Sequence, residues 1–127
     1  MIGKHKIMII DDNPVDQLIT EHVLRLNDKC RDIITMASGS EALSYLTLNA
    51  KNPEALPSRI FLDLDMPVMN GFDFLQQFKE CVDEVKEGCS IVVVTASEVS
   101  ADLEKIRSNP HVIKLVAKPL YRHSLVL

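Results

Sequence analysis

Cysteine and histidine are few and scattered in this sequence, which excludes two kinds of structural framework. The three cysteines, Cys30, Cys81 and Cys89, include no C-x-x-C pair. The apolar run near the first residue ends at Asp11, too soon for a secretion signal. We therefore expect reduced thiols and a cytoplasmic location. The four histidines have no spacing typical of a zinc site.

The sequence also lacks the charge and the long apolar segments that mark nucleic-acid-binding and membrane proteins. Its net charge is −4, and it contains no basic block and no basic segment rich in aromatic residues. No apolar run approaches the roughly 20 residues of a membrane-spanning helix. We therefore expect neither direct nucleic-acid binding nor a membrane partner.

What is present is a globular composition arranged in a regular alternation. Hydrophobic residues make up 46% of the chain and charged residues 25%, and its 127 residues suit a single domain, which we expect to cover 1–127. Short apolar runs rich in β-branched residues alternate with segments of helical periodicity. The runs predict five strands, at 6–10, 33–36, 59–62, 90–94 and 112–116.

Helix signals occupy the first two intervals between these runs. Asn13-Pro14 is typical of a helix start, because proline suits the first turn. Ser38, with Glu41 three residues later, predicts a capping box at the start of a second helix. The segment 51–58 contains two prolines and is predicted to be a loop.

Three further helices are expected after the third strand. Gly71 opens the first of them, Ser97 is expected to cap the second, and a short last helix is expected to start at Lys118-Pro119. The apolar stripes predicted for the first two are Phe72, Leu75, Phe78 and Val82, and then Val99, Leu103 and Ile106.

This alternation is the pattern of an α/β fold, in which a doubly wound parallel sheet carries helices on both faces. Right-handed connections between the strands place all the carboxyl ends at one edge of such a sheet. Open α/β folds bind their ligands at that edge, so we expect the functional residues there.

Polar residues follow four of the predicted strands and should meet at this edge. Asp11 and Asp12 follow the first strand, Asp63 the third, Thr95 the fourth and Lys118 the fifth. Buried carboxylates repel one another and lose their hydration. Mg²⁺ relieves both costs, because it takes oxygen ligands from one or two carboxylates together with water and phosphate.

Carboxylates, a hydroxyl and an ammonium in one place suit phosphoryl transfer to a carboxylate. Asp63 is the candidate nucleophile. Lys118 would neutralise charge on the phosphoryl oxygens, and Thr95 would donate a hydrogen bond to one of them. Each residue alone is more commonly a turn, cap, strand or solvated residue. Their occurrence together at four strand ends is what favours this chemistry.

Four segments surround these residues: IIDD ending at Asp12, FLDLDMPVMNG around Asp63, VVVTA around Thr95 and AKPL around Lys118. In this order, and across nearly the whole chain, they resemble the receiver domain of bacterial two-component response regulators, the CheY-like family. The resemblance implies a five-stranded parallel sheet of order 2-1-3-4-5. It also implies a phosphoprotein in which Asp63 accepts the phosphoryl group.

The resemblance implies a Mg²⁺ site with a defined set of ligands. Asp12 resembles the direct carboxylate ligand, and Asp11 resembles the one that reaches the ion through water. Asp63 is expected to bind the ion as well as the phosphoryl group. The backbone carbonyl of Asp65 matches the position that completes the protein ligands.

The resemblance also assigns residues to the phosphoryl group itself. Thr95 resembles the switch hydroxyl that moves to a phosphoryl oxygen, and Ala96 the small residue that leaves room for the group. Lys118 resembles the lysine that pairs with a phosphoryl oxygen. Asp65 and Ser97 match positions that influence how fast the aspartyl phosphate hydrolyses.

The function implied by the resemblance is signalling, with the chain acting as a switch or relay rather than as a metabolic enzyme. The phosphoryl donor would be a phosphohistidine on a sensor histidine kinase or a histidine phosphotransfer protein. The domain would catalyse its own phosphorylation and dephosphorylation. Because no output domain is expected, the signal would pass to an unidentified downstream protein. The surface of the fourth helix and fifth strand would change shape for this partner. We expect a monomer or a weak homodimer.

Three features depart from the common pattern of the family. Leu115 stands where many members have a tyrosine or phenylalanine that swings inward on activation. The segment 47–58 is longer than in compact members, as in the single-domain regulators associated with bacterial phytochromes. The sequence ends at Leu127, so we expect a short last helix.

Two other functions stay open at this point. The D-x-D of Asp63 and Asp65 also resembles the nucleophile motif of haloacid-dehalogenase-type phosphatases. That motif usually lies on the first strand, and Pro67 stands where its threonine would be. The other is a receiver-like binding module that is never phosphorylated. Such a module need not keep Asp12, Asp63, Thr95 and Lys118 together, which argues against it.

Overall fold

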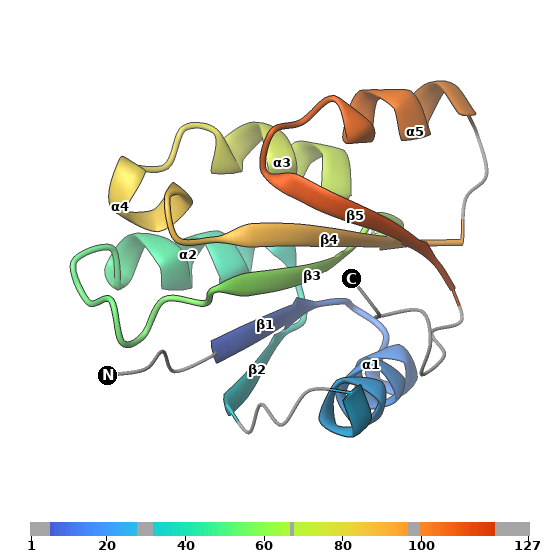
Figure 1. Cartoon of the computed structure of the whole chain (residues 1–127), viewed down its shortest axis with the longest axis horizontal. Helices are drawn as coiled ribbons and strands as arrows, with labels where there is room; N and C mark the ends of the chain where they lie inside the picture. The colour runs from blue at the N-terminus through green and yellow to red at the C-terminus, as the bar shows by residue number, and fades with distance from the viewer. Residues whose placement is uncertain (1–5, 28–31, 67, 97–99, 119–127) are drawn as a thin grey trace.

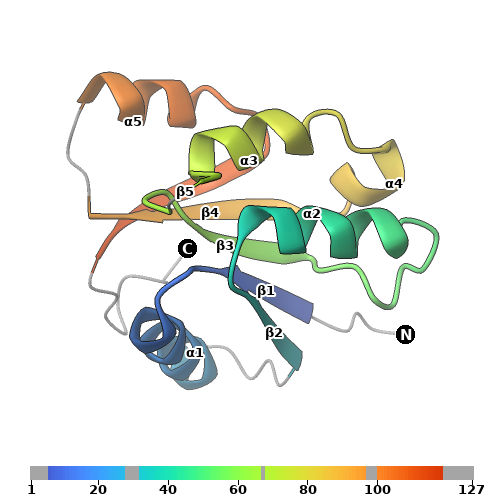
Figure 2. The same cartoon turned by 180° about the vertical axis from the view of Figure 1, so that it is seen from behind.

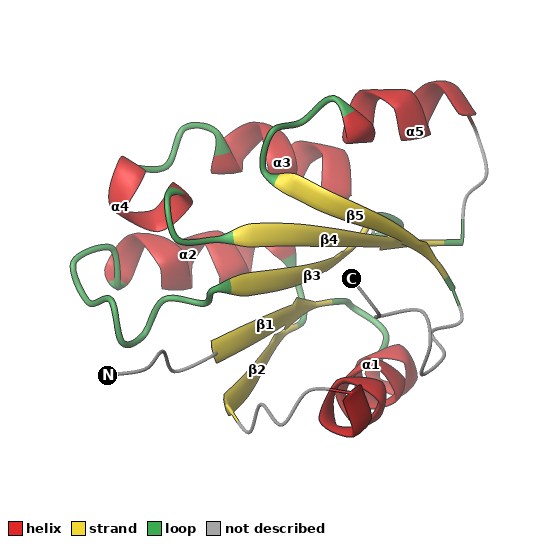
Figure 3. Cartoon of the chain, in the orientation of Figure 1, coloured by secondary structure: helices red, strands yellow, loops and turns green. Residues whose placement is uncertain are grey.

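A computed structural model describes residues 6–27, 32–66, 68–96 and 100–118, in which strands and helices alternate (Figures 1 and 3). The strands are β1 Lys6–Ile10, β2 Asp32–Met36, β3 Arg59–Asp63, β4 Ser90–Thr95 and β5 Val112–Ala117. The helices are α1 Pro14–Asn27, α2 Gly39–Leu48, α3 Gly71–Phe78, α4 Asp83–Lys86 and α5 Ser100–Arg107.

All four strand pairings are parallel, and the sheet has the order β2-β1-β3-β4-β5. This confirms the predicted fold class and strand order. The strands β1, β3 and β4 lie inside the sheet and are buried along nearly their whole length, as their almost continuous apolar sequences predict. Their carboxyl ends all lie toward the right of Figure 1, so the edge predicted to hold the polar residues exists.

The described helices lie on both faces of the sheet (Figures 1 and 2). Among the described helices, only α1 lies on one of the two faces, where Val23 and Leu24 belong to the same core cluster as Ile9 and Phe61. The other four described helices lie on the opposite face, over the larger core cluster, which contains Phe74 and Phe78, the largest fully buried side chains in the described part of the chain. None of the described helices is long and apolar enough to cross a membrane.

Helix ends differ from the predictions in two places. The stripe predicted to reach Val82 stops at Phe78, because α3 ends there; Val82 is 52% exposed and precedes α4, a helix that was not predicted. At α2, Ser38 accepts the N–H of Glu41 as expected, but the Glu41 carboxylate accepts from the N–H of Ala37 instead of completing the capping box.

Some predictions concern residues that lie outside the described part of the chain. These are the cap at Ser97, the stripe residue Val99, the last helix from Pro119 and the thiol of Cys30. Within the described part, Cys81 and Cys89 are free thiols, as expected.

Gly71 begins α3 at a point where the chain passes very close to the end of β3. A Cβ atom there would lie 2.8 Å from the Cα and Cδ1 of Leu64 and 3.2 Å from the carbonyl oxygen of Asp63. The Gly71 N–H also donates to the carbonyl of Leu64 at 3.1 Å, which ties the helix start to the loop that follows Asp63.

We therefore predict that Gly71→Ala lowers the free energy of unfolding by about 1–3 kcal/mol, because the backbone of Leu64 must move. Gly88→Ala is the matched control. No atom lies within 4 Å of the added methyl group, so a small gain of about 0.4–1 kcal/mol is expected from the stiffer unfolded chain. Urea unfolding measures the free energy of unfolding of both variants. Equal effects at positions 71 and 88 would contradict the close contact between position 71 and Leu64.

Candidate functional site

Backbone hydrogen bonds continue past the strand ends and fix the residues that follow them. The N–H of Asp11 donates to Met36 at 3.0 Å, and the N–H of Lys118 donates to Thr95 at 2.9 Å. Asp63 is the last residue of β3 and is paired in register with Val94. The sheet itself therefore carries Asp11, Asp63, Thr95 and Lys118 to one edge, as the sequence predicted.

Three carboxylates gather at this edge, and we call Asp11, Asp12 and Asp63 the acidic site. One carboxylate oxygen from each lies within 4.8 Å of the others. Asp11 and Asp63 are each only 3% exposed, whereas Asp12 faces solvent. Hard oxygen donors, closely spaced and open to solvent on one side, fit Mg²⁺, which binds one or two carboxylates and keeps several waters.

Lys118 is surrounded by carboxylates. Its Nζ lies 2.8 Å from Oδ2 of Asp16, 3.3 Å from Oδ2 of Asp11 and 3.3 Å from Oδ1 of Asp63. Burial alone would lower the pKa of Lys118, but the hydrogen bond to Asp16 and the charges of Asp63 and Asp11 outweigh it and raise the pKa above its ordinary value. Lys118 is therefore a fixed positive charge in this site.

The ionised form of the Asp11 carboxyl is disfavoured in this site. Burial raises its pKa from 3.8 to about 6, and the charge of Asp63 adds to this effect. A hydrogen bond from the N–H of Asn13, at 2.9 Å, and the contact with Lys118 act in the opposite direction but do not cancel it. The acidic site therefore carries electrostatic strain that a bound cation would relieve.

Asp65 contacts the two sides of the site through different groups. Its N–H donates to Oδ1 of Asp63 at 3.1 Å. Its carboxylate Oδ2 accepts from the buried hydroxyl of Thr95 at 3.4 Å and from the N–H of Ala96 at 3.3 Å. The predicted role of the Asp65 carbonyl as a metal ligand stays a prediction, whereas this contact of its carboxylate with Thr95 was not predicted.

Asp16 is the residue of the site that the sequence analysis did not single out. It lies in the first turn of α1, and its carboxylate makes the shortest of the three contacts to Lys118. The available signal was the spacing Asn13-x-x-Asp16 at a helix start, which is typical of a capping pair and gives no reason to expect a contact with the end of β5.

The raised pKa predicts that Asp11→Asn stabilises the metal-free protein more at neutral pH than in acid. The folded chain binds the Asp11 proton more tightly than the unfolded chain, so the contribution of Asp11 to the stability of the wild type falls as the pH rises from about 4 through about 6. The variant lacks this loss. Its advantage in unfolding free energy should grow by up to about 3 kcal/mol between about pH 4 and pH 7.

Urea unfolding in EDTA, at several pH values, measures this difference for the two proteins. An advantage of Asp11→Asn that stays flat or shrinks as the pH rises would show that the buried carboxyl is not strained.

Comparison with protein families and curated proteins agrees with this geometry. The family model described as the response regulator receiver domain matches residues 7–127. A curated protein named "Probable methanogenesis regulatory protein FilR2", from Methanothrix harundinacea, is 30% identical over 114 residues, which are 90% of this chain and 72% of that protein. The next two curated relatives are longer, and the chain spans 25% and 37% of their lengths.

Solved structures share the fold over nearly the whole chain. A two-component response regulator from Cytophaga hutchinsonii matches with a TM-score of 0.87 at 23% identity, covering 98% of this chain and 92% of that one, which shows the fold alone. The bacteriophytochrome response regulator AtBRR matches with a TM-score of 0.76 at 25% identity, covering 97% of this chain and 88% of that one.

The acidic site is consistent with phosphoacceptor signalling, and receiver domains are in general signalling modules rather than enzymes. From the match over residues 7–127 and the relative at 30% identity, this chain belongs to the response regulator receiver domain family.

Proposed function

We propose that this domain is a signalling switch or relay in which Asp63 accepts a phosphoryl group from a phosphohistidine. The observation that carries the proposal is the meeting of three carboxylates with the Lys118 ammonium at the carboxyl edge of the sheet. A sensor histidine kinase or a histidine phosphotransfer protein is the proposed donor, and a further protein is the proposed recipient of the signal.

The proposed Mg²⁺ ligands are the carboxylates of Asp12 and Asp63, with Asp11 acting through water and Asp65 through its backbone carbonyl. Their spacing and oxygen chemistry support this set. When bound, the ion would supply positive charge to the acidic site and to the phosphoryl oxygens.

Asp63 supplies the nucleophile. The N–H of Asp65 and the ammonium of Lys118 both contact its Oδ1, so we assign the attack on phosphorus to Oδ2. A bond forms between this oxygen and phosphorus while the bond from phosphorus to the donor's imidazole nitrogen breaks, and the electron pair stays on that nitrogen. Attack by water on phosphorus later returns the carboxylate and releases inorganic phosphate.

Lys118 and Thr95 are the proposed partners of the phosphoryl oxygens. Lys118 already lies 3.3 Å from the Asp63 carboxylate, so its charge is in place before the group arrives. Thr95 donates to the Asp65 carboxylate at 3.4 Å in this structure. On phosphorylation, the Thr95 hydroxyl would leave the Asp65 carboxylate and donate to a phosphoryl oxygen instead. This change of acceptor is the proposed switch at the end of β4.

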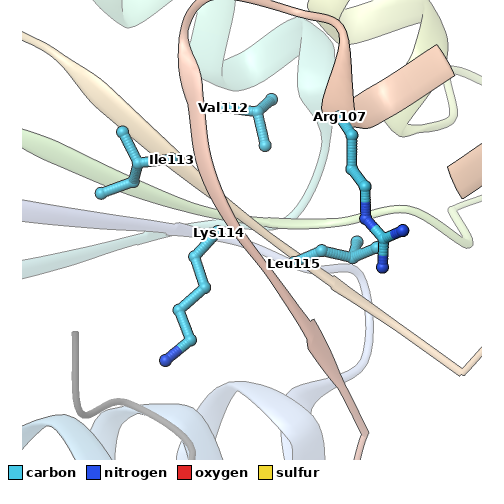
Figure 4. A pocket seen from close by; sticks show the side chains of 5 residues that line it. All are labelled: Arg107, Val112, Ile113, Lys114 and Leu115. Carbon is cyan, nitrogen blue, oxygen red and sulfur yellow. The ribbon is translucent and has the colours of Figure 1, made fainter. Parts of the chain in front are cut away.

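The proposed output surface is formed by α5 and β5. A pocket of about 260 Å³ lies there, lined by Arg107 of α5 and by Val112, Ile113, Lys114 and Leu115 of β5 (Figure 4). Figure 4 shows the Leu115 side chain directed toward Arg107. Leu115 is partly buried against the core, so a shift of Thr95 would reach this surface through aliphatic packing rather than through an aromatic ring.

We predict that acetyl phosphate adds one phosphoryl group to the wild type in the presence of Mg²⁺ and none to Asp63→Asn. Intact-mass spectrometry measures the adduct, with EDTA in place of Mg²⁺ as the second condition. Asp73→Asn is the matched control, since Asp73 is an acidic residue in the first turn of the neighbouring helix α3, outside the acidic site. It should be phosphorylated like the wild type.

The other outcomes distinguish the rival functions. No adduct in the wild type, despite binding of Mg²⁺ and of beryllofluoride, would indicate a binding module. Rapid release of phosphate over many turnovers without an adduct would indicate a phosphatase. An adduct that persists in Asp63→Asn would place the phosphoryl group on another residue.

A further inference from the structure

Among the described residues, the closest acidic partner of Lys118 is Asp16, a carboxylate that has no part in the proposed metal site. The Asp16 contact is 2.8 Å, against 3.3 Å for both Asp11 and Asp63. A lysine ammonium has three N–H donors, and in the described part of the chain three carboxylates match them in number. Asp11 and Asp63 belong to the acidic site, whereas Asp16 does not.

Two helices in this chain begin with the same spacing, and the comparison shows how Asp16 differs. At α3, Asn70 accepts the N–H of Asp73 at 3.0 Å, and the Asp73 carboxylate accepts the N–H of Asn70 at 3.3 Å, which completes a capping box. The Asp73 carboxylate is therefore hydrogen-bonded to the start of its own helix.

At α1, the asparagine side chain accepts the aspartate N–H as in α3, but the reciprocal bond to the aspartate carboxylate is replaced by another. Asn13 accepts the N–H of Asp16 at 3.1 Å, but the N–H of Asn13 donates to Asp11 at 2.9 Å. The Asp16 carboxylate is directed to Lys118 instead. Because Asp11 accepts the N–H of Asn13, the carboxylate of Asp16, at the third position of α1, is free to contact Lys118.

The position of Asp16 suits a lasting contact with a cation. It lies in the first turn of α1, where the helix dipole stabilises a negative charge. The Asp16 and Lys118 side chains are 34% and 19% exposed, so their attraction is less screened than that of a surface pair. When a cation binds the acidic site and a phosphoryl group is attached to Asp63, Asp16 is a carboxylate outside that site that can keep its contact with Lys118.

We propose that Asp16 is a positioning residue, which holds the Lys118 ammonium at the site where the phosphoryl oxygens arrive. This inference rests on the proposed function, because it concerns how fast Asp63 is phosphorylated. Without Asp16, Lys118 would turn toward Asp11 and Asp63, and the ion pairs that phosphorylation must break would become stronger.

The test compares rates of phosphorylation by acetyl phosphate, at saturating Mg²⁺, for the wild type, Asp16→Asn and Asp73→Asn. Asp16→Asn should be slower by about fivefold, as expected from losing a modest ion pair. Asp16→Glu should recover part of the rate, because it keeps the charge. Asp73→Asn removes a negative charge at the same helical position of α3, outside the acidic site, and should keep the rate of the wild type.

A double-mutant cycle separates positioning from an effect on helix stability. In a Lys118→Ala background, Asp16→Asn should change the rate by less than about twofold, because its effect passes through Lys118. A slowing of equal size in both backgrounds would overturn the inference. A faster reaction of Asp16→Asn would also overturn it and would make Asp16 a competitor of the phosphoryl group.

The outcome for the wild type separates this inference from the proposed function. If the wild type takes up no phosphoryl group, the proposed function fails and the inference fails with it. If the wild type is phosphorylated on Asp63 and Asp16→Asn reacts at the same rate, only the inference fails.

Discussion

The repulsion among the carboxylates at the carboxyl edge is the constraint on which the rest of this structure depends. Asp11 and Asp63 are almost fully buried within a few ångströms of each other. Burial, and to a smaller extent the charge of Asp63, raises the pKa of Asp11 to about 6. The Lys118 ammonium offsets part of this repulsion by contacting both carboxylates. Such a site is poorly compensated without a cation and well suited to gain one, together with the oxygens of a phosphoryl group.

The fold holds these charges in place because each charged residue follows a strand of the sheet. Asp63 ends β3 at the centre of the sheet, and hydrogen bonds between strands continue to Asp11 and Lys118. The parts that can exchange partners are side chains: Thr95, which donates to Asp65, and Lys118, which contacts three carboxylates. A rigid sheet with exchangeable polar contacts at its edge is the physical basis of the switch that we propose, in which a small shift at this edge would alter the packing of α5 and β5.

The sequence pattern predicted the parallel sheet and the meeting of Asp63 with Lys118, because buried parallel strands have a simple apolar pattern and their carboxyl ends meet at one edge. The strand order was predicted by the resemblance to the receiver family. The sequence did not predict the contacts of Asp16 and of the Asp65 carboxylate, since these depend on the direction of side chains in a helix turn and a loop. It also placed Val82 in α3, because apolar spacing alone does not mark where a helix ends and a short one begins.

The most direct test of this account measures the free energy of unfolding in urea as a function of Mg²⁺ concentration at constant ionic strength. A cation that binds the folded acidic site must stabilise it by an amount that grows with the logarithm of its concentration above the dissociation constant. The account predicts this rise for the wild type and a much smaller one for Asp12→Asn, which removes the solvent-facing carboxylate. A stability that does not respond to Mg²⁺ would contradict the assignment of Asp11, Asp12 and Asp63 as a metal site.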